Sequence, residues 1–405
     1  MEDLKLYKPD GTLGLEFQSD GPQARPVVIL LRLINDALDS TATDIHIEPE
    51  GRKSVVRYRV DGFLRPAAAY EHDLGRQLLQ CVKVLCDLDI TNKNRFQDGS
   101  FRGIRANHEI DFRVSVMQEV GGDKMVIRIL DRTVGTNLIE RLGMHQDLVD
   151  TLRAFARRTQ GTLIVAGPTG AGKTTTLYGI LNEIDRARRN AISIEDPVEY
   201  HLPLMTQIHV DPKLKMTFAA SLRSALRQDP NVLMIGEIRD AETADIALQS
   251  ALTGHLVLTT THAKDAIGAI FRLVDLKIPP YQLVSSVDLI LAQRLARKLC
   301  VQCKQPMSVT PRYFELLGFP VPQTDTVYRA RGCAACGDTG YSGRTGISEL
   351  LQMNDALREA ILRKAPETEL QAMVNSGPYA RMIHDAMRKV EAGIMSMEEV
   401  SRVLG

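Results

Sequence analysis

The sequence has little of what a dedicated nucleic-acid binder or a membrane-spanning protein needs. Its 405 residues include no tryptophan and only 5% aromatic residues, and no group of aromatics suggests a platform on which bases could stack. Lys and Arg together number 50, as do Asp and Glu, so the basic excess typical of a nucleic-acid binder is missing. The best apolar run, Val27 to Leu31, is interrupted by Arg32, far short of the ~20 residues that span a membrane.

No secretion signal is expected at the amino terminus. The first residues, MEDLKLYKPDG, are charged and polar and contain no apolar central region. The composition is that of an ordinary globular protein, and the length allows two or three domains, each with its own core.

The first part of the chain mixes strand-like and helical patterns. Its helical segments are 27–39 and 78–90, and its strand-like segments are 54–62, 110–116 and 124–130. A turn is expected at Gly121-Gly122, between the last two strands. This order predicts an α+β domain with a meandering sheet over residues 1–130.

A different pattern begins near residue 161. Short apolar strands separated by helical stretches are expected at 162–167, 191–196, 231–236 and 255–260. Such alternation predicts a mostly parallel sheet with crossover helices, and therefore an α/β core. Pro279-Pro280 is expected to open a further helix, since leucine or valine recurs with helical spacing as far as Leu299. Polar amphipathic helices are expected from about residue 354 to the end.

The segment GPTGAGKTTTLYG fits the phosphate-binding pattern G-x-x-x-x-G-K-[ST]. A chance match is the alternative, but an apolar strand precedes the segment and a helical pattern follows it. In such a loop, backbone N–H groups at a helix N-terminus bind phosphate oxygens. Lys173 would reach the β- and γ-phosphates, and Thr174 would ligate Mg²⁺. The expected nucleotide-binding residues are Gly167, Pro168, Thr169, Gly170, Ala171, Gly172, Lys173, Thr174 and Thr175.

Acidic residues follow two of the predicted strands. Glu237, after 231–236, could bind Mg²⁺ through water or orient the attacking water; the alternative is an exposed acid at a strand end. The segment IEDPVEY places Glu195, Asp196 and Glu199 near the carboxyl edge of the sheet, where parallel sheets bind ligands. A carboxylate there could act as general base, and the alternative is a solvated acidic turn.

Two histidines flank the strand at 255–260. A lone histidine is more often structural than functional, but at the end of a strand in this topology His255 or His262 could sense the γ-phosphate.

Four of the six cysteines form two CxxC pairs separated by 29 residues, at Cys300, Cys303, Cys333 and Cys336. Two such pairs predict tetrahedral thiolate ligation of a structural Zn²⁺. A redox-active pair is the alternative, which the lack of a thioredoxin-like pattern disfavours. Cys81 and Cys86 lie on the apolar face of the predicted helix 78–90 and are expected in the buried core rather than as metal ligands. Six cysteines together with a nucleotide motif favour a cytoplasmic location, where thiols stay reduced and CxxC pairs tend to bind metal.

Four segments in order resemble the secretion ATPase superfamily of type II secretion and type IV pili. They are GPTGAGKTTTL, IEDPVEY, RQDPNVLMIGEIRDAET and TGHLVLTTTH. The resemblance implies a RecA-like P-loop core in which Glu199 is the catalytic base and Glu237 the Walker B acid. It also implies that His255 and His262 sense the phosphate or a neighbouring subunit. The motif around His262 departs from the family's usual THTND, because this chain has THAKD.

The preceding part of the chain resembles the PAS-like domain that comes before the ATPase core in this family. The matching segments are DIHIEP, RYRVDGFLR, QDGSFR and IDFRVSV. Family members place arginines of that domain on the nucleotide phosphates, and here Arg113 and Arg128 match. The alternative is that both are ion-pair residues at a strand edge. The additional amino-terminal domain of many assembly ATPases has no counterpart here, as expected of a shorter member or of a trimmed chain.

The cysteine pairs followed by GYSGRTGISEL resemble the assembly ATPases rather than the retraction motors. The resemblance therefore implies a Mg²⁺-dependent, homo-hexameric ATPase at the cytoplasmic face of the inner membrane. Through a platform protein it would drive assembly of a type IV pilus or a type II secretion pseudopilus. The rival is a nucleic-acid motor, although no stable nucleic-acid partner is expected. The expected domains are 1–130, a linker at 131–145, the ATPase core 146–298, the zinc unit 299–345 and the helical region 346–405.

Overall fold

The computed structural model describes residues 4–16, 25–91, 96–131, 139–376 and 381–405. Its contacts divide the chain into two compact units, Met1–Val134 and Gly135–Gly405. Most of the expected linker, residues 132–138, lies outside the described residues, and the part that follows contains the short 3-10 helix η2 (Ile139–Leu142).

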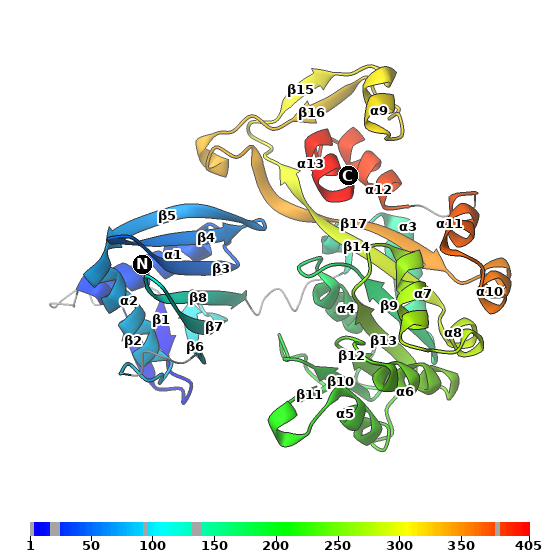
Figure 1. The fold of residues 1–405 in the computed structure, drawn as a ribbon, viewed down its shortest axis with the longest axis horizontal. Helices are drawn as coiled ribbons and strands as arrows, with labels where there is room; N and C mark the ends of the chain where they lie inside the picture. Colours follow the sequence, from blue (N-terminus) through cyan, green and yellow to red (C-terminus); the bar gives the residue numbers. More distant parts are fainter. Residues whose placement is uncertain (1–3, 17–24, 92–95, 132–138, 377–380) are drawn as a thin grey trace. The chain divides into compact units, whose positions relative to one another are not determined.

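The first unit is an eight-stranded antiparallel sheet in the order β2-β1-β6-β7-β8-β3-β4-β5 (Figure 1). The helices α1 (Arg25–Asp39) and α2 (His72–Leu85) cover one face and share its apolar core. This arrangement confirms the predicted α+β domain. The strands are β1 (Lys5–Tyr7), β2 (Leu13–Glu16), β3 (Asp44–Glu50), β4 (Lys53–Val60), β5 (Phe63–Glu71), β6 (Gln97–Arg105), β7 (His108–Glu119) and β8 (Gly122–Asp131).

The second unit is built on a seven-stranded sheet in the order β11-β10-β12-β13-β9-β14-β17. All neighbours are parallel except β14 and β17, which confirms the predicted, mostly parallel α/β core. The strands are β9 (Gly161–Ala166), β10 (Ala191–Glu195), β11 (Thr206–His209), β12 (Val232–Ile235), β13 (Leu256–Thr261), β14 (Leu289–Leu299) and β17 (Tyr341–Gln352).

Helices cover both faces of this sheet. Successive residues of each strand point to opposite faces, so each strand contributes side chains to the core on either side. Leu163 and Val165 pack with α3 and α4, whereas Ile164 and Ala166 join the core that the other helices cover. The helices are α3 (Gln146–Ala156), α4 (Lys173–Asn182), α5 (Phe218–Ala225), α6 (Ala241–Leu252), α7 (Ala266–Asp275) and α8 (Pro280–Ser286).

The helix predicted from Pro279 to Leu299 is wrong beyond Ser286. Residues 289–299 form strand β14, which pairs in parallel with β9 and antiparallel with β17 (Figure 1). A strand between two neighbours is buried on both faces and reads as a continuous apolar run, here Leu289 to Ala292. The spacing of the leucines fits a helix as well, so periodicity alone misassigned this segment.

The cysteine pairs lie at the base of an excursion between β14 and β17. The excursion contains a two-stranded hairpin and a short helix, which extend beyond the ends of these strands (Figure 1). Four helices follow, as the amphipathic pattern predicts. These elements are β15 (Gln305–Ser308), α9 (Pro311–Leu317), β16 (Thr326–Arg329), η4 (Ala334–Cys336), α10 (Asp355–Leu362), α11 (Glu367–Ser376), α12 (Met382–Glu391) and α13 (Met397–Leu404).

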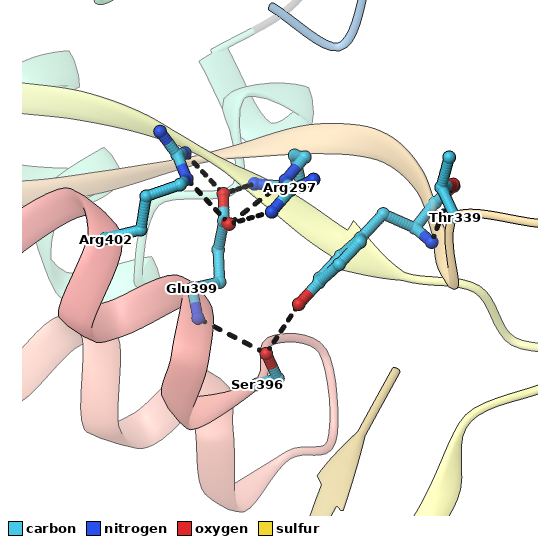
Figure 2. Close-up of polar contacts among 6 residues, drawn as sticks. Arg297, Thr339, Ser396, Glu399 and Arg402 are labelled. Atoms are coloured by element: carbon cyan, nitrogen blue, oxygen red, sulfur yellow. Dashed lines mark hydrogen bonds and ion pairs between the residues drawn. The ribbon is translucent and has the colours of Figure 1, made fainter. Parts of the chain in front are cut away.

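A buried carboxylate fastens the last helix to the sheet (Figure 2). Glu399 of α13 is 0% exposed and accepts hydrogen bonds from Arg297 of β14 and from Arg402. Although burial opposes it, these bonds lower the pKa of Glu399. Ser396 caps α13 and contacts the Tyr341 hydroxyl at 2.9 Å, and the Arg297 guanidinium lies over the Tyr341 ring.

Replacing Glu399 with alanine is expected to release α13. The change leaves two arginines without their common carboxylate, and breaking a buried ion pair costs roughly 3–5 kcal/mol. Amide hydrogen exchange of residues 397–404 measures the loss. Glu369→Ala is the matched control, because it removes an exposed partner of Arg363 and should leave the exchange unchanged. Equal exchange in both variants would contradict this account.

Candidate nucleotide-binding site

The P-loop occupies the carboxyl end of β9. Gly172, the N-cap of α4, adopts a left-handed conformation with φ of 84°. The first N–H groups of a helix have no intrahelical acceptor, and here no side chain of the N-cap accepts from them either. A Cβ at Gly170 would meet no atom within 4 Å, whereas one at Gly167 would lie 2.6 Å from the Gln293 carbonyl oxygen. The loop is therefore braced behind Gly167 and open beside Gly170. This open cradle of N–H groups fits a phosphate.

Lys173 lies folded onto the loop. Its Nζ donates to the carbonyl oxygens of Gly167 at 2.8 Å and Pro168 at 3.2 Å. Burial lowers the pKa of Lys173, while the carboxylate of Glu237 acts in the opposite direction. The two hydrogen bonds therefore hold the ammonium group at the loop.

Gln293 of β14 holds the P-loop in place through two hydrogen bonds. Its Nε2 donates to the Ala171 carbonyl at 2.7 Å, and its Oε1 accepts from the Thr176 hydroxyl at 2.8 Å. One buried amide thus ties the P-loop to the first turn of α4. The sequence did not indicate this residue, because its segment was expected to be helical.

Glu237 follows β12 at the same edge of the sheet. His262, after β13, places its Nε2 3.5 Å from one carboxylate oxygen, and Arg239 binds the other. Although burial opposes it, Arg239, His262 and Lys173 lower the pKa of Glu237. This carboxyl group is therefore ionised at neutral pH, as a magnesium or water ligand must be.

Arg239 also joins two of the acidic segments. Besides Glu237 it contacts Asp196, whose Oδ2 is 3.7 Å from its Nη1. Asp196 begins the loop 196–205 between β10 and β11, and Glu199, half-buried, follows on the same loop. The carboxyl edge of the sheet thus carries the P-loop, Glu237, His262 and the Glu199 loop, as the order of the motifs predicts.

His255 lies elsewhere. It precedes β13, so it is at the amino edge of the sheet, where its carbonyl accepts from Gly161 at the start of β9. Its ring bonds to the Ser250 carbonyl at 2.9 Å. At ~3.3 Å per residue, the length of β13 puts it about 20 Å from His262. This placement corrects the expectation that His255 senses phosphates at the P-loop of its own chain.

Arg113 and Arg128 belong to the first unit. They lie opposite each other on β7 and β8, on neighbouring positions of one sheet face. Asp44 is 5% exposed and pairs with Arg128 at 3.1 Å and with Arg59 at 3.3 Å. Arg128 and Arg59 therefore share the Asp44 carboxylate. The Arg128 side chain is nevertheless 62% exposed.

The four cysteines of the CxxC pairs form a cluster that can bind a metal. Their Sγ atoms all lie within 4.8 Å of one another. The Sγ–Sγ distances are 3.9 Å for Cys300–Cys333 and Cys303–Cys336 and 3.8 Å for Cys333–Cys336. A tetrahedral Zn²⁺ with bonds of ~2.3 Å requires sulfur separations of about 3.8 Å. Although burial opposes it, amide hydrogen bonds from Cys333 and Gly340 lower the pKa of Cys336 and favour the thiolate that binds metal. The residues present fit a zinc ion.

The remaining two cysteines are not part of this cluster. Cys86 is buried and Cys81 is half-buried in the core of the first unit, as expected. Burial raises the pKa of Cys86 to about 12, so its thiol stays protonated.

Within the described residues, no helix is both long and apolar enough to span a membrane.

The parallel sheet, the P-loop at its carboxyl edge and the acidic partner on the adjoining strand define a P-loop ATPase with a RecA-like core. The chain belongs to the type II/IV secretion system protein family, whose model matches residues 20–402.

Individual proteins agree with this assignment. The chain is 43% identical to a type II secretion system protein E of Pseudomonas aeruginosa, covering 96% of this chain and 77% of the relative. It is 41% identical to the type II secretion system ATPase E of Vibrio cholerae, covering 96% and 76%. The crystal structure of the pilus retraction motor PilT with bound ADP superposes with a TM-score of 0.62 at 25% identity, covering 92% and 96%.

Proposed function

We propose that this chain is the Mg²⁺-dependent ATPase of a type II secretion or type IV pilus assembly machine. The observation that carries the proposal is the grouping of Lys173, Glu237 and His262 at the open P-loop. The relatives named for type II secretion favour a pseudopilus as the assembled structure.

In the proposed reaction, the N–H groups of the loop and the Lys173 ammonium bind the β- and γ-phosphates of ATP. Lys173 must leave the Gly167 and Pro168 carbonyls to do so, and the exchange replaces neutral acceptors by charged ones. Thr174 and Glu237 would hold Mg²⁺, which would neutralise phosphate charge. Glu199 takes the proton of the water that attacks the γ-phosphorus, ADP leaves, and His262 reports on the transferred γ-phosphate through its contact with Glu237.

The first unit would complete the site. Arg113 and Arg128 would contribute positive charge to the phosphates when that unit closes on the nucleotide, an effect worth roughly 10³–10⁵ in rate in arginine-finger enzymes. Closure and reopening in a homo-hexameric ring would then move a platform protein at the cytoplasmic face of the inner membrane. Zn²⁺ held by the four cysteines would fix the excursion between β14 and β17.

The test is the ATP hydrolysis rate per chain as protein concentration rises, with and without the cytoplasmic domain of the platform protein. A ring predicts a per-chain rate that increases with concentration, and a motor predicts further stimulation by the platform. A constant rate that ignores the platform would contradict the proposal. Stimulation by DNA that disappears with rising salt would instead support a nucleic-acid motor.

A further inference from the structure

A buried hydrogen-bond network joins the P-loop helix to the loop that carries Glu199. Glu195, at the carboxyl end of β10, is 2% exposed and accepts from the Tyr178 hydroxyl at 2.5 Å and from the Ser193 hydroxyl at 2.6 Å. Tyr178 is 1% exposed and lies on α4, the helix that begins at Lys173. A carboxylate withdrawn from water is tolerated only where donors satisfy it, so these hydroxyls hold Glu195 in place.

Gln207 of β11 holds the other end of the network. Its Nε2 donates to Glu195 at 3.2 Å and to the Tyr200 carbonyl at 2.9 Å. Its Oε1 accepts from the Leu202 amide at 2.8 Å. One side chain therefore fixes the loop backbone at two positions just beyond Glu199, while its own position is set by the carboxylate on the neighbouring strand.

The Tyr178 ring also packs against the loop that carries Glu199. Burial and then the charge of Glu195 raise the pKa of Tyr178, while the backbone amides of Glu199 and Tyr200 act in the opposite direction. The rings of Tyr178 and Tyr200 meet edge to face with centroids 5.8 Å apart. The loop thus packs directly on a residue of the P-loop helix.

We propose that Tyr178, Glu195 and Gln207 are positioning residues that hold the Glu199 carboxylate where the attacking water is activated. The inference rests on the proposed function, because it takes Glu199 as the base of ATP hydrolysis. The network makes the position of Glu199 depend on that of α4, so the group that binds phosphate and the group that activates water move together. Binding of ATP itself depends on the P-loop amides and Lys173, which the network leaves in place.

The first test separates turnover from binding in Tyr178→Phe and Gln207→Met. Both remove hydrogen bonds to the network and add no charge. We expect kcat to fall by up to roughly 100-fold, the loss that a misplacement of about 1 Å can cause, while the affinity for a non-hydrolysable ATP analogue stays unchanged. Tyr341→Phe is the matched control, since it removes one buried hydroxyl bond far along the chain, to Ser396, and should keep the wild-type kcat. If Tyr178→Phe does not fold, Gln207→Met decides.

The second test asks whether the network acts through Glu199. In the background of Glu199→Gln, the added Tyr178→Phe change should not slow turnover further, because the position of the base no longer matters once the base is absent. Losses that multiply would overturn the proposal, as would wild-type kcat in Tyr178→Phe and Gln207→Met. If Glu199→Gln alone turns over ATP at the wild-type rate, the base assignment of the proposed function fails, and this inference fails with it.

Discussion

Glu237→Gln is expected to bind ATP and to lose its hydrolysis by roughly 100- to 1,000-fold, the range found when one charged or hydrogen-bonding group is removed from a transition state. The amide has the shape of the carboxylate but cannot carry the charge that attracts Mg²⁺. It also cannot form the ion pair with Arg239. Fluorescent-nucleotide binding and phosphate release, measured on the same preparation, check both halves of the prediction.

Glu242→Gln is the matched control for this change. Glu242 is an exposed acid of α6 in the same unit and pairs with Arg223. Its replacement should leave both binding and turnover unchanged. If Glu237→Gln hydrolyses ATP as fast as the wild type, then Glu237 is only the ion-pair partner of Arg239, and the proposed acid role is refuted.

Removal of metal is expected to have the largest effect on stability. In zinc-finger peptides, metal binding contributes roughly 10–16 kcal/mol to folding. Here the four thiols join the two ends of the excursion between β14 and β17, so Cys303→Ser or a strong chelator should loosen residues 300–340, although Phe314 and Val327 remain packed in the main core. Metal analysis should find one zinc per chain in the wild type and a substoichiometric amount in the variant, and amide exchange should locate the unfolding.

Cys81→Ser is the control for the metal prediction, because Cys81 is outside the cluster and should keep full metal content. Since thiolates bind the metal and thiols do not, zinc retention should also weaken as the pH falls. If wild-type protein without zinc protects residues 300–340 from exchange as well as the zinc-bound protein does, the metal prediction is wrong.

The sequence predicted those features that depend on local pattern. Strands β9, β10, β12 and β13 are short apolar runs, and parallel strands place the residues after their carboxyl ends at a common edge. The P-loop, Glu237 and His262 therefore came together as expected. The same rule would have placed His255 correctly, since it precedes its strand and so belongs to the opposite edge.

Features that depend on which distant segments pair with each other could not be predicted from the sequence. Strand β14 was predicted to be a helix because the spacing of its leucines fits a helix as well as a strand. For the same reason the contact of Gln293 with the P-loop was not predicted. The bridge from Arg239 to Asp196 and the network around Glu195 depend on which strands are neighbours. A single sequence carries no signal for such partners, because an isolated arginine, glutamine or tyrosine has many possible contacts.

Phosphate release from ATP by the wild type and by Lys173→Ala tests the central claim most directly. We expect steady hydrolysis by the wild type. Lys173 is the side chain of the P-loop expected to bind the transferred phosphate, so its removal should abolish most of that activity. The expected loss in the variant is at least roughly 100-fold, with Lys298→Ala, an exposed lysine of the same unit, unaffected. Equal rates in wild type and Lys173→Ala would show that the hydrolysis arises elsewhere and would contradict the assignment of this edge of the sheet as the ATPase site.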